Sequence, residues 1–224
     1  MNKKIIIPIV VLGIFIIIGL ILYFVLTVQS DEARFKKEYE KLNGQKNENK
    51  KTYVQVSIPK ENNIQYLDFE EVMKFLKEGT GIIYFGFPEC PWCRNAVPVL
   101  IDAAKENETT IYYYNALPIR DIKQLNEDGK IETTKKGTKN YYKLVDKLKD
   151  YLPAYEGLDD ASIKRLYFPT VFFVQGGKIV GMHEGTVDSQ ENPYKVLNKK
   201  QKVELKQIYI NNINKIYGVC DESC

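Results

Sequence analysis

The sequence predicts an α/β domain, a central mixed sheet flanked by helices, preceded by one transmembrane helix. Three observations lead to this expectation. Between about residues 52 and 218, short apolar runs alternate with segments whose apolar residues recur at helical spacing. A C-x-x-C pair, Cys90 and Cys93, lies where one apolar run meets a helix. An uncharged stretch of 24 residues, 5–28, lies near the N-terminus.

Length and composition limit the classes of function that the protein can have. The 224 residues accommodate one domain of ordinary size plus extensions. The net charge of +3 is small and Lys and Glu are mixed along the chain, so we expect no nucleic-acid partner. The single histidine, His183, would have to be the sole general base of a Cys–His protease, which argues against that class. His183 is predicted to be an ordinary strand residue.

The uncharged stretch is expected to be an uncleaved signal-anchor. At about 1.5 Å per residue it spans the roughly 30 Å hydrocarbon layer with some tilt. The residues at its end do not form a cleavage site, and no Cys follows for a lipid anchor. Lys3 and Lys4 favour a cytoplasmic tip, although four Lys and Arg residues follow closely on the other side. Because cysteine pairs are used mainly outside the cytosol, residues 1–30 are predicted to anchor an extracytoplasmic domain in the cell membrane by a single pass.

Residues 31–51 are polar and rich in Asn and Lys, and are predicted to be a linker. Its first half is expected to continue as a helix through Phe35, Tyr39 and Leu42, and residues 43–51 are expected to be a flexible tether. The folded domain is predicted to occupy residues 52–218. Its first strand is expected to contain Tyr53 and to end at Pro59.

The next elements alternate regularly. A short strand over 64–67 precedes a helix that Asp68 caps, with Glu71 in the capping-box position and Gly79 at the end. A strand over 81–85 is followed by a helix from about residue 92, with Pro98 inside it. A further strand is predicted over 110–115. This β-α-β-α-β order places the C-x-x-C pair directly after the central strand.

The pair carries chemistry because of its position. Two cysteines three residues apart on the first turn of a helix are close enough to form a disulfide. The free N–H groups and the dipole at that helix end favour a thiolate. A thiolate is the attacking species in disulfide exchange. The second cysteine of the pair then attacks the mixed disulfide and releases the substrate. By itself, the spacing leaves a zinc knuckle or an inert disulfide open.

The strand–Cys-Pro-Trp-Cys–helix arrangement, together with Phe168-Pro169-Thr170, resembles the thioredoxin superfamily. That family places a cis-proline opposite its cysteine pair, just before a β-hairpin. Pro169 fits, because 170–175 and 178–183 are predicted strands joined at Gly176-Gly177. The resemblance implies a thioredoxin-like fold without a cofactor or metal. It makes Cys90 the exposed nucleophile and Cys93 the buried resolving thiol, with substrate contacts from Trp92, Phe168, Pro169 and Thr170.

The nearest resemblance is to membrane-anchored thioredoxin-like proteins of Gram-positive bacteria, including those described as bacteriocin transport accessory proteins. Two positions depart from the thioredoxin pattern. Tyr84 stands where thioredoxins keep a buried carboxylate, and Pro91-Trp92 replaces the common Gly-Pro. Because such residues tune the potential, the direction of electron transfer is left open. Glu89, close in sequence to Cys90, is expected to be exposed.

The chain is longer than a compact thioredoxin between Cys93 and Pro169. The excess, about residues 120–165, is predicted to be a helical insertion. It comprises a polar loop with Gly129 and Gly137, an amphipathic helix over about 140–152, and a short helix over 159–166. The longer helix either only packs on the sheet or also contacts the substrate. A final helix over about 198–217, stopped by Gly218, is expected to be well buried.

The tail over 219–224 carries a second pair, Cys220 and Cys224. It is a structural disulfide, a redox pair that exchanges with the first, part of a four-cysteine zinc site, or a pair of free thiols. We expect the whole protein to be a membrane-anchored thiol–disulfide oxidoreductase that acts on protein cysteines, with a membrane electron-transfer partner. The alternatives are a non-catalytic module that holds client proteins and a zinc-binding structural domain.

Overall fold

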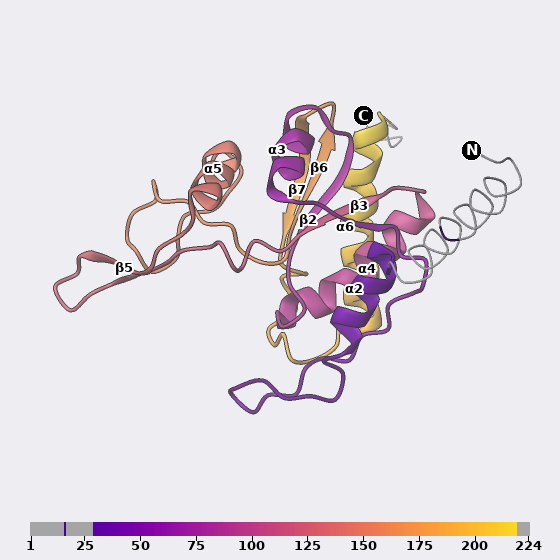
Figure 1. The fold of residues 1–224 in the computed structure, drawn as a ribbon. Coiled ribbons are helices and arrows are strands. Elements are labelled where there is room, and N and C mark those ends of the chain that lie inside the picture. The colour runs from indigo at the N-terminus through magenta and orange to yellow at the C-terminus, as the bar shows by residue number, and fades with distance from the viewer. Residues whose placement is uncertain (1–15, 17–28, 219–224) are drawn as a thin grey trace, which may run out of the picture.

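The computed structural model describes residue 16 and residues 29–218 (Figure 1). The predicted signal-anchor and the tail with Cys220 and Cys224 therefore lie outside the described residues. Within the described part, no helix is both long enough and apolar enough to cross a membrane.

The centre of the domain is a five-stranded mixed sheet in the order β1-β3-β2-β6-β7. Its strands are β1 (Ile64–Tyr66), β2 (Gly81–Phe85), β3 (Ile111–Tyr114), β6 (Thr170–Gln175) and β7 (Lys178–Glu184). The first three pair in parallel, whereas β6 runs antiparallel to both β2 and β7. All five residues of β2 are buried, as expected for a strand covered on both faces. The α/β class and the mixed sheet are confirmed.

Helices cover both faces of the sheet (Figure 1). One core cluster joins the sheet to α2 (Asp31–Glu40), α4 (Pro91–Glu106) and α6 (Lys199–Tyr217). The other core cluster joins it to α3 (Phe69–Glu78) and α5 (Lys139–Leu148). The predicted caps are confirmed: Asp68 and Glu71 form a capping box on α3, and Asn198 caps α6. Gly218 ends α6 with φ of 65°, which favours glycine.

The helix expected in the first half of residues 31–51 is confirmed as α2, but this helix packs on the domain instead of serving as a spacer. Helix α2 packs into the core through Phe35 and Tyr39, both with 0% of their surface exposed. Beyond it, the side chain of Asn43 exchanges two hydrogen bonds with the backbone of Val56, at 2.7 and 2.9 Å. Two aromatic side chains anchor a helix that is otherwise polar. The average composition of the helix therefore does not indicate that one of its faces is buried.

The predicted first strand around Tyr53 is also wrong. Residues 53–58 are extended but join no sheet strand. Side chains replace the strand partner: Ile58 donates its N–H to the Glu40 carboxylate at 2.8 Å, and the Val54 carbonyl accepts from Arg94. Val56 and Ile58 of this segment belong to the core cluster that contains residues of α2 and α4.

The insertion differs in detail from the prediction. The expected polar loop is an antiparallel hairpin of β4 (Ile122–Leu125) and β5 (Ile131–Lys135), which projects from the domain (Figure 1). Helix α5 is confirmed, with Tyr141, Leu144 and Leu148 buried, although it ends four residues earlier than predicted. No helix forms over 159–166, which consists of a turn, bends and an isolated antiparallel bridge between Lys164 and Ala154. Helix α6 buries only one face, and Val203 on the other face is 62% exposed.

Candidate active site

Cys90 and Cys93 lie where β2 passes into α4. Cys90 is the N-cap of α4, and its sulfur accepts the backbone N–H of Cys93 at 3.1 Å. Pro91 occupies the first turn, where its missing N–H costs nothing. This cap holds the two cysteines on one turn with Cys90 at the positive end of the helix dipole.

The structure brings the predicted proline loop to the cysteine pair. The Phe168–Pro169 peptide bond is cis, as expected from the resemblance. The Cys90 sulfur lies 3.5 Å from the Phe168 carbonyl oxygen and donates to it. Thr170, the first residue of β6, pairs with Phe85 at the end of β2. Residues 78 positions apart in sequence therefore form one site.

Both cysteines are free thiols, and their exposures correct one expectation. Cys90 was expected to be exposed, but only 4% of its surface is accessible, against 0% for Cys93. Cys90 is therefore the more accessible thiol by a small margin. Trp92, between them, is half-buried, and Glu89 is exposed as expected.

The surroundings of Cys93 oppose its ionisation. Burial, followed by the neighbouring Cys90, raises the pKa of the Cys93 thiol well above its usual value. A hydrogen bond from the Tyr84 side chain acts in the opposite direction and lowers it. The Tyr84 hydroxyl in turn lies 2.9 Å from that of Tyr39, and both residues are 0% exposed. A Cβ at Gly86 would lie 2.1 Å from the Tyr84 hydroxyl oxygen, so only glycine leaves that oxygen in place.

These contacts place the Tyr84 hydroxyl where a thiolate at Cys93 would need a donor, with the Tyr39 hydroxyl behind it. Replacing Tyr84 by Phe is expected to slow the attack of Cys93 on a mixed disulfide about tenfold near neutral pH, because a hydrogen bond to the charged sulfur is lost. Removing a contact that lowers the pKa of Cys93 moves the pH profile of this step to higher pH. Rapid-mixing kinetics over a pH series measures the profile.

Tyr209 offers the matched control for this experiment. Its hydroxyl is buried and has no hydrogen-bond partner in the described part of the chain. Tyr209→Phe should therefore leave the pH profile in place, whereas Tyr39→Phe should shift it less than Tyr84→Phe does. An unchanged profile in Tyr84→Phe would show that the hydroxyl does not act on Cys93.

A buried arginine follows Cys93 directly, and the sequence patterns did not identify it as part of the site. Arg94 is 1% exposed, and its guanidinium donates to the carbonyls of Val54 and Tyr39 at 2.6 and 2.8 Å. It also donates to the Pro88 carbonyl at 3.2 Å and to the Asn43 side-chain oxygen at 2.7 Å. No carboxylate of the described residues pairs with it. Arg94 therefore fastens α2 and the segment after it to the helix that carries the cysteines. The polar sequence of residues 31–51 does not indicate that this segment supplies hydrogen-bond partners to a buried arginine.

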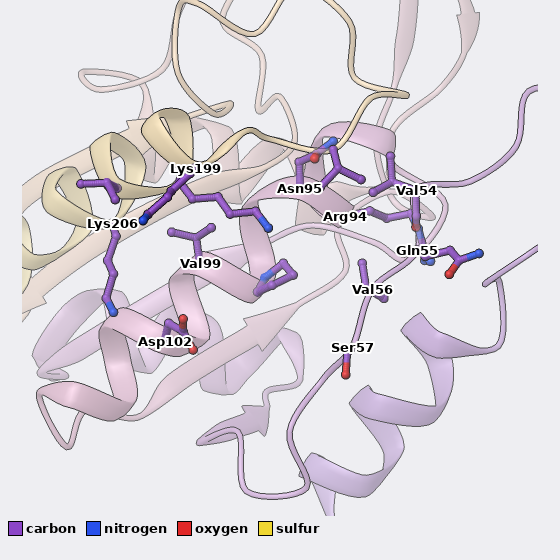
Figure 2. A pocket seen from close by; sticks show the side chains of 14 residues that line it. Val54, Gln55, Val56, Ser57, Arg94, Asn95, Val99, Asp102, Lys199 and Lys206 are labelled. Carbon is purple, nitrogen blue, oxygen red and sulfur yellow. The ribbon is translucent and has the colours of Figure 1, made fainter.

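A cavity of about 660 Å³ lies on the α4–α6 side of the domain (Figure 2). Arg94, Asn95, Val99 and Asp102 of α4 line it, and Lys199 and Lys206 of α6 stand on its other side. Neither cysteine lines this cavity. It is therefore separate from the thiol site.

The described residues contain no group of three or more His, Cys, Asp or Glu side chains that could hold a metal ion. The four-cysteine zinc alternative needs Cys220 and Cys224, which lie outside the described residues, and it stays a prediction. Comparison with protein-family models, curated proteins and solved structures gave no match.

Proposed function

We propose that the protein is a membrane-anchored thiol–disulfide oxidoreductase of thioredoxin-like fold that acts on protein cysteines outside the cytosol. The observation that carries the proposal is Cys90 at the N-cap of α4, with Cys93 one turn on and the Phe168 carbonyl 3.5 Å from the Cys90 sulfur. The five-stranded mixed sheet and the cis bond before Pro169 agree with this fold. The anchor and the side of the membrane rest on residues 1–30 of the sequence alone.

The proposed reaction transfers two electrons between the Cys90–Cys93 dithiol and a disulfide of the substrate. In the reducing direction, the Cys90 thiolate attacks one sulfur of a substrate disulfide, forms a mixed disulfide and releases the other substrate sulfur as a thiolate. Cys93 then attacks the Cys90 sulfur, and the bond to the substrate breaks. The substrate leaves with both sulfurs reduced, the proton of Cys93 passes to a released thiolate, and Cys90–Cys93 becomes the disulfide. The oxidising direction is the reverse of these steps.

Substrate access follows from the same geometry. The proline loop lies beside Cys90, and its half-buried residue Phe168 is the member of the loop best able to contact a substrate strand that approaches the sulfur. Pro169 and Thr170 are buried, so a contact from either requires the substrate to reach the backbone of the loop. Trp92 adjoins the pair in sequence and is half-buried. A membrane electron-transfer partner would restore the working redox state of the pair.

The reduction potential of the Cys90–Cys93 pair tests the proposal. Trp92 is the only tryptophan, so its fluorescence in glutathione or dithiothreitol buffers reports the state of the pair in the full-length protein. We expect one reversible two-electron transition that persists when Cys220 and Cys224 are both replaced by Ser. A potential near about −270 mV indicates a reductase, and one near about −120 mV an oxidase.

Absence of a reversible transition would contradict the proposal. A disulfide that resists reduction would then favour the client-holding module. Bound zinc, with thiols protected from alkylation, would favour the structural zinc domain.

A further inference from the structure

The insertion places two arginines at the edge of the proposed active site. The guanidinium carbon of Arg120 lies 4.8 Å from the centre of the Phe168 ring, and Arg120 also donates weakly to the Leu166 carbonyl. The Phe168 ring packs edge-on against Phe87, three residues before Cys90, at 5.4 Å. The Phe168 carbonyl contacts the Cys90 sulfur, so Phe168 lies between Arg120 and the thiol and contacts both.

The second arginine lies on the same segment, just before the proline loop. Arg165 stacks on Tyr155 at 4.0 Å and lies 5.3 Å from the ring centre of Tyr167. Stacking occupies the faces of a guanidinium and leaves its N–H edge available for hydrogen bonds. The Nε atom of Arg165 is buried and has no hydrogen-bond partner in the described residues. This arginine therefore has donor capacity that the described part of the chain does not use.

The two positive charges repel each other, and neither is neutralised by an ion pair within the described residues, although Asp121 acts to raise the pKa of Arg120. After burial, repulsion from Arg165 is the largest influence that lowers the pKa of Arg120. Neither arginine forms an ion pair with a carboxylate of the described residues. The neighbouring carboxylates do not form ion pairs with these arginines. Asp121 lies 3.8 Å from Lys123, and Glu156 is exposed.

We propose that Arg120 and Arg165, held by Tyr155, Tyr167 and Phe168, form a binding subsite for carboxylate side chains of the substrate polypeptide. We call these five residues the arginine subsite. The preferred substrates are then cysteine-containing segments rich in Asp or Glu, since a carboxylate matches the fork of a guanidinium. The inference rests on the proposed function, because the subsite serves the substrate that Cys90 attacks.

Three synthetic peptides test the subsite with the reduced full-length protein. Each carries one intramolecular disulfide and no Trp, and they differ only in the two residues beside the cysteines, which are Glu, Gln or Lys. Trp92 fluorescence gives the second-order rate constant for oxidation of the Cys90–Cys93 pair. We expect the Glu peptide to react about tenfold faster than the Lys peptide at low salt, as charge-assisted hydrogen bonds imply. High salt should shrink the difference.

Matched variants test whether Arg120 and Arg165 cause the preference for the Glu peptide. In the Arg120→Gln, Arg165→Gln double variant the rates of the three peptides should converge. Arg120→Lys should keep part of the preference, because the charge remains while the stacked fork is lost. Arg34→Gln is the control, since Arg34 is an exposed arginine on α2 that pairs with Glu38. It should react like the unaltered protein.

The outcomes separate the subsite from the function. Equal rates for the three peptides in the unaltered protein, or a preference that persists in the double variant, would overturn the subsite while the oxidoreductase stands. If no peptide oxidises the pair, the proposed function itself fails. Should the double variant not fold, the peptide series on the unaltered protein still decides the preference.

Discussion

Replacing Cys93 by Ser is expected to trap substrates on Cys90 and to lower turnover by at least about a thousandfold. Cys90 keeps its place at the N-cap of α4 in this variant, so it still attacks a substrate disulfide. Without the second thiol the mixed disulfide is not resolved, and it accumulates. Non-reducing gels and mass spectrometry of the protein after exposure to a peptide disulfide would detect the adduct at Cys90.

Cys90→Ser is the matched control for this trapping experiment. It should lose turnover to the same degree but form no adduct, because Cys93 is fully buried and its thiol pKa is raised by burial. An adduct on Cys93 in this variant would reverse the roles of the two cysteines. Full turnover in either variant would remove the pair from the chemistry.

Replacing Arg94 by Met is expected to lower the free energy of unfolding by about 3–5 kcal/mol. The change leaves the carbonyls of Val54 and Tyr39 and the Asn43 side chain without the guanidinium, while these groups stay partly or wholly buried. Each buried acceptor that loses its partner costs about 1–3 kcal/mol. Methionine keeps the apolar stem of the side chain but not the guanidinium, so the loss reports mainly the hydrogen bonds, with a smaller contribution from the space that the guanidinium leaves. Denaturant unfolding, followed by Trp92 fluorescence, measures it.

Arg34→Met provides the comparison for Arg94. The Arg34 side chain is 53% exposed and its ion pair with Glu38 lies on the surface of α2, so the expected change is within about 1 kcal/mol. Equal destabilisation of the two variants would show that the buried hydrogen bonds of Arg94 contribute nothing beyond those of a surface residue. Because Arg94 also holds the backbone of Tyr39, its loss should additionally weaken the Tyr39–Tyr84 contact near Cys93.

Local patterns predicted the parts of the site that lie within one turn or one strand. The apolar run of β2, the helix after it and the spacing of Cys90 and Cys93 are contiguous in the sequence, and each was placed correctly. The hairpin after Pro169 and the caps of α3 and α6 were also placed correctly, since turn glycines and capping residues act over a few positions. Errors arose where composition was averaged, as over residues 31–51.

The sequence by itself determined the local features of the candidate site, because a cysteine pair at a strand–helix junction and a proline before a hairpin are patterns of a few neighbouring residues. Only the tertiary structure decided what surrounds them. Tyr39 meets Tyr84 across 45 positions, and Arg94 reaches the Val54 carbonyl across 40. The arginines of the insertion meet the proline loop in the same way. Such contacts depend on how separate elements pack on the sheet, and no pattern within a single helix or strand encodes that packing.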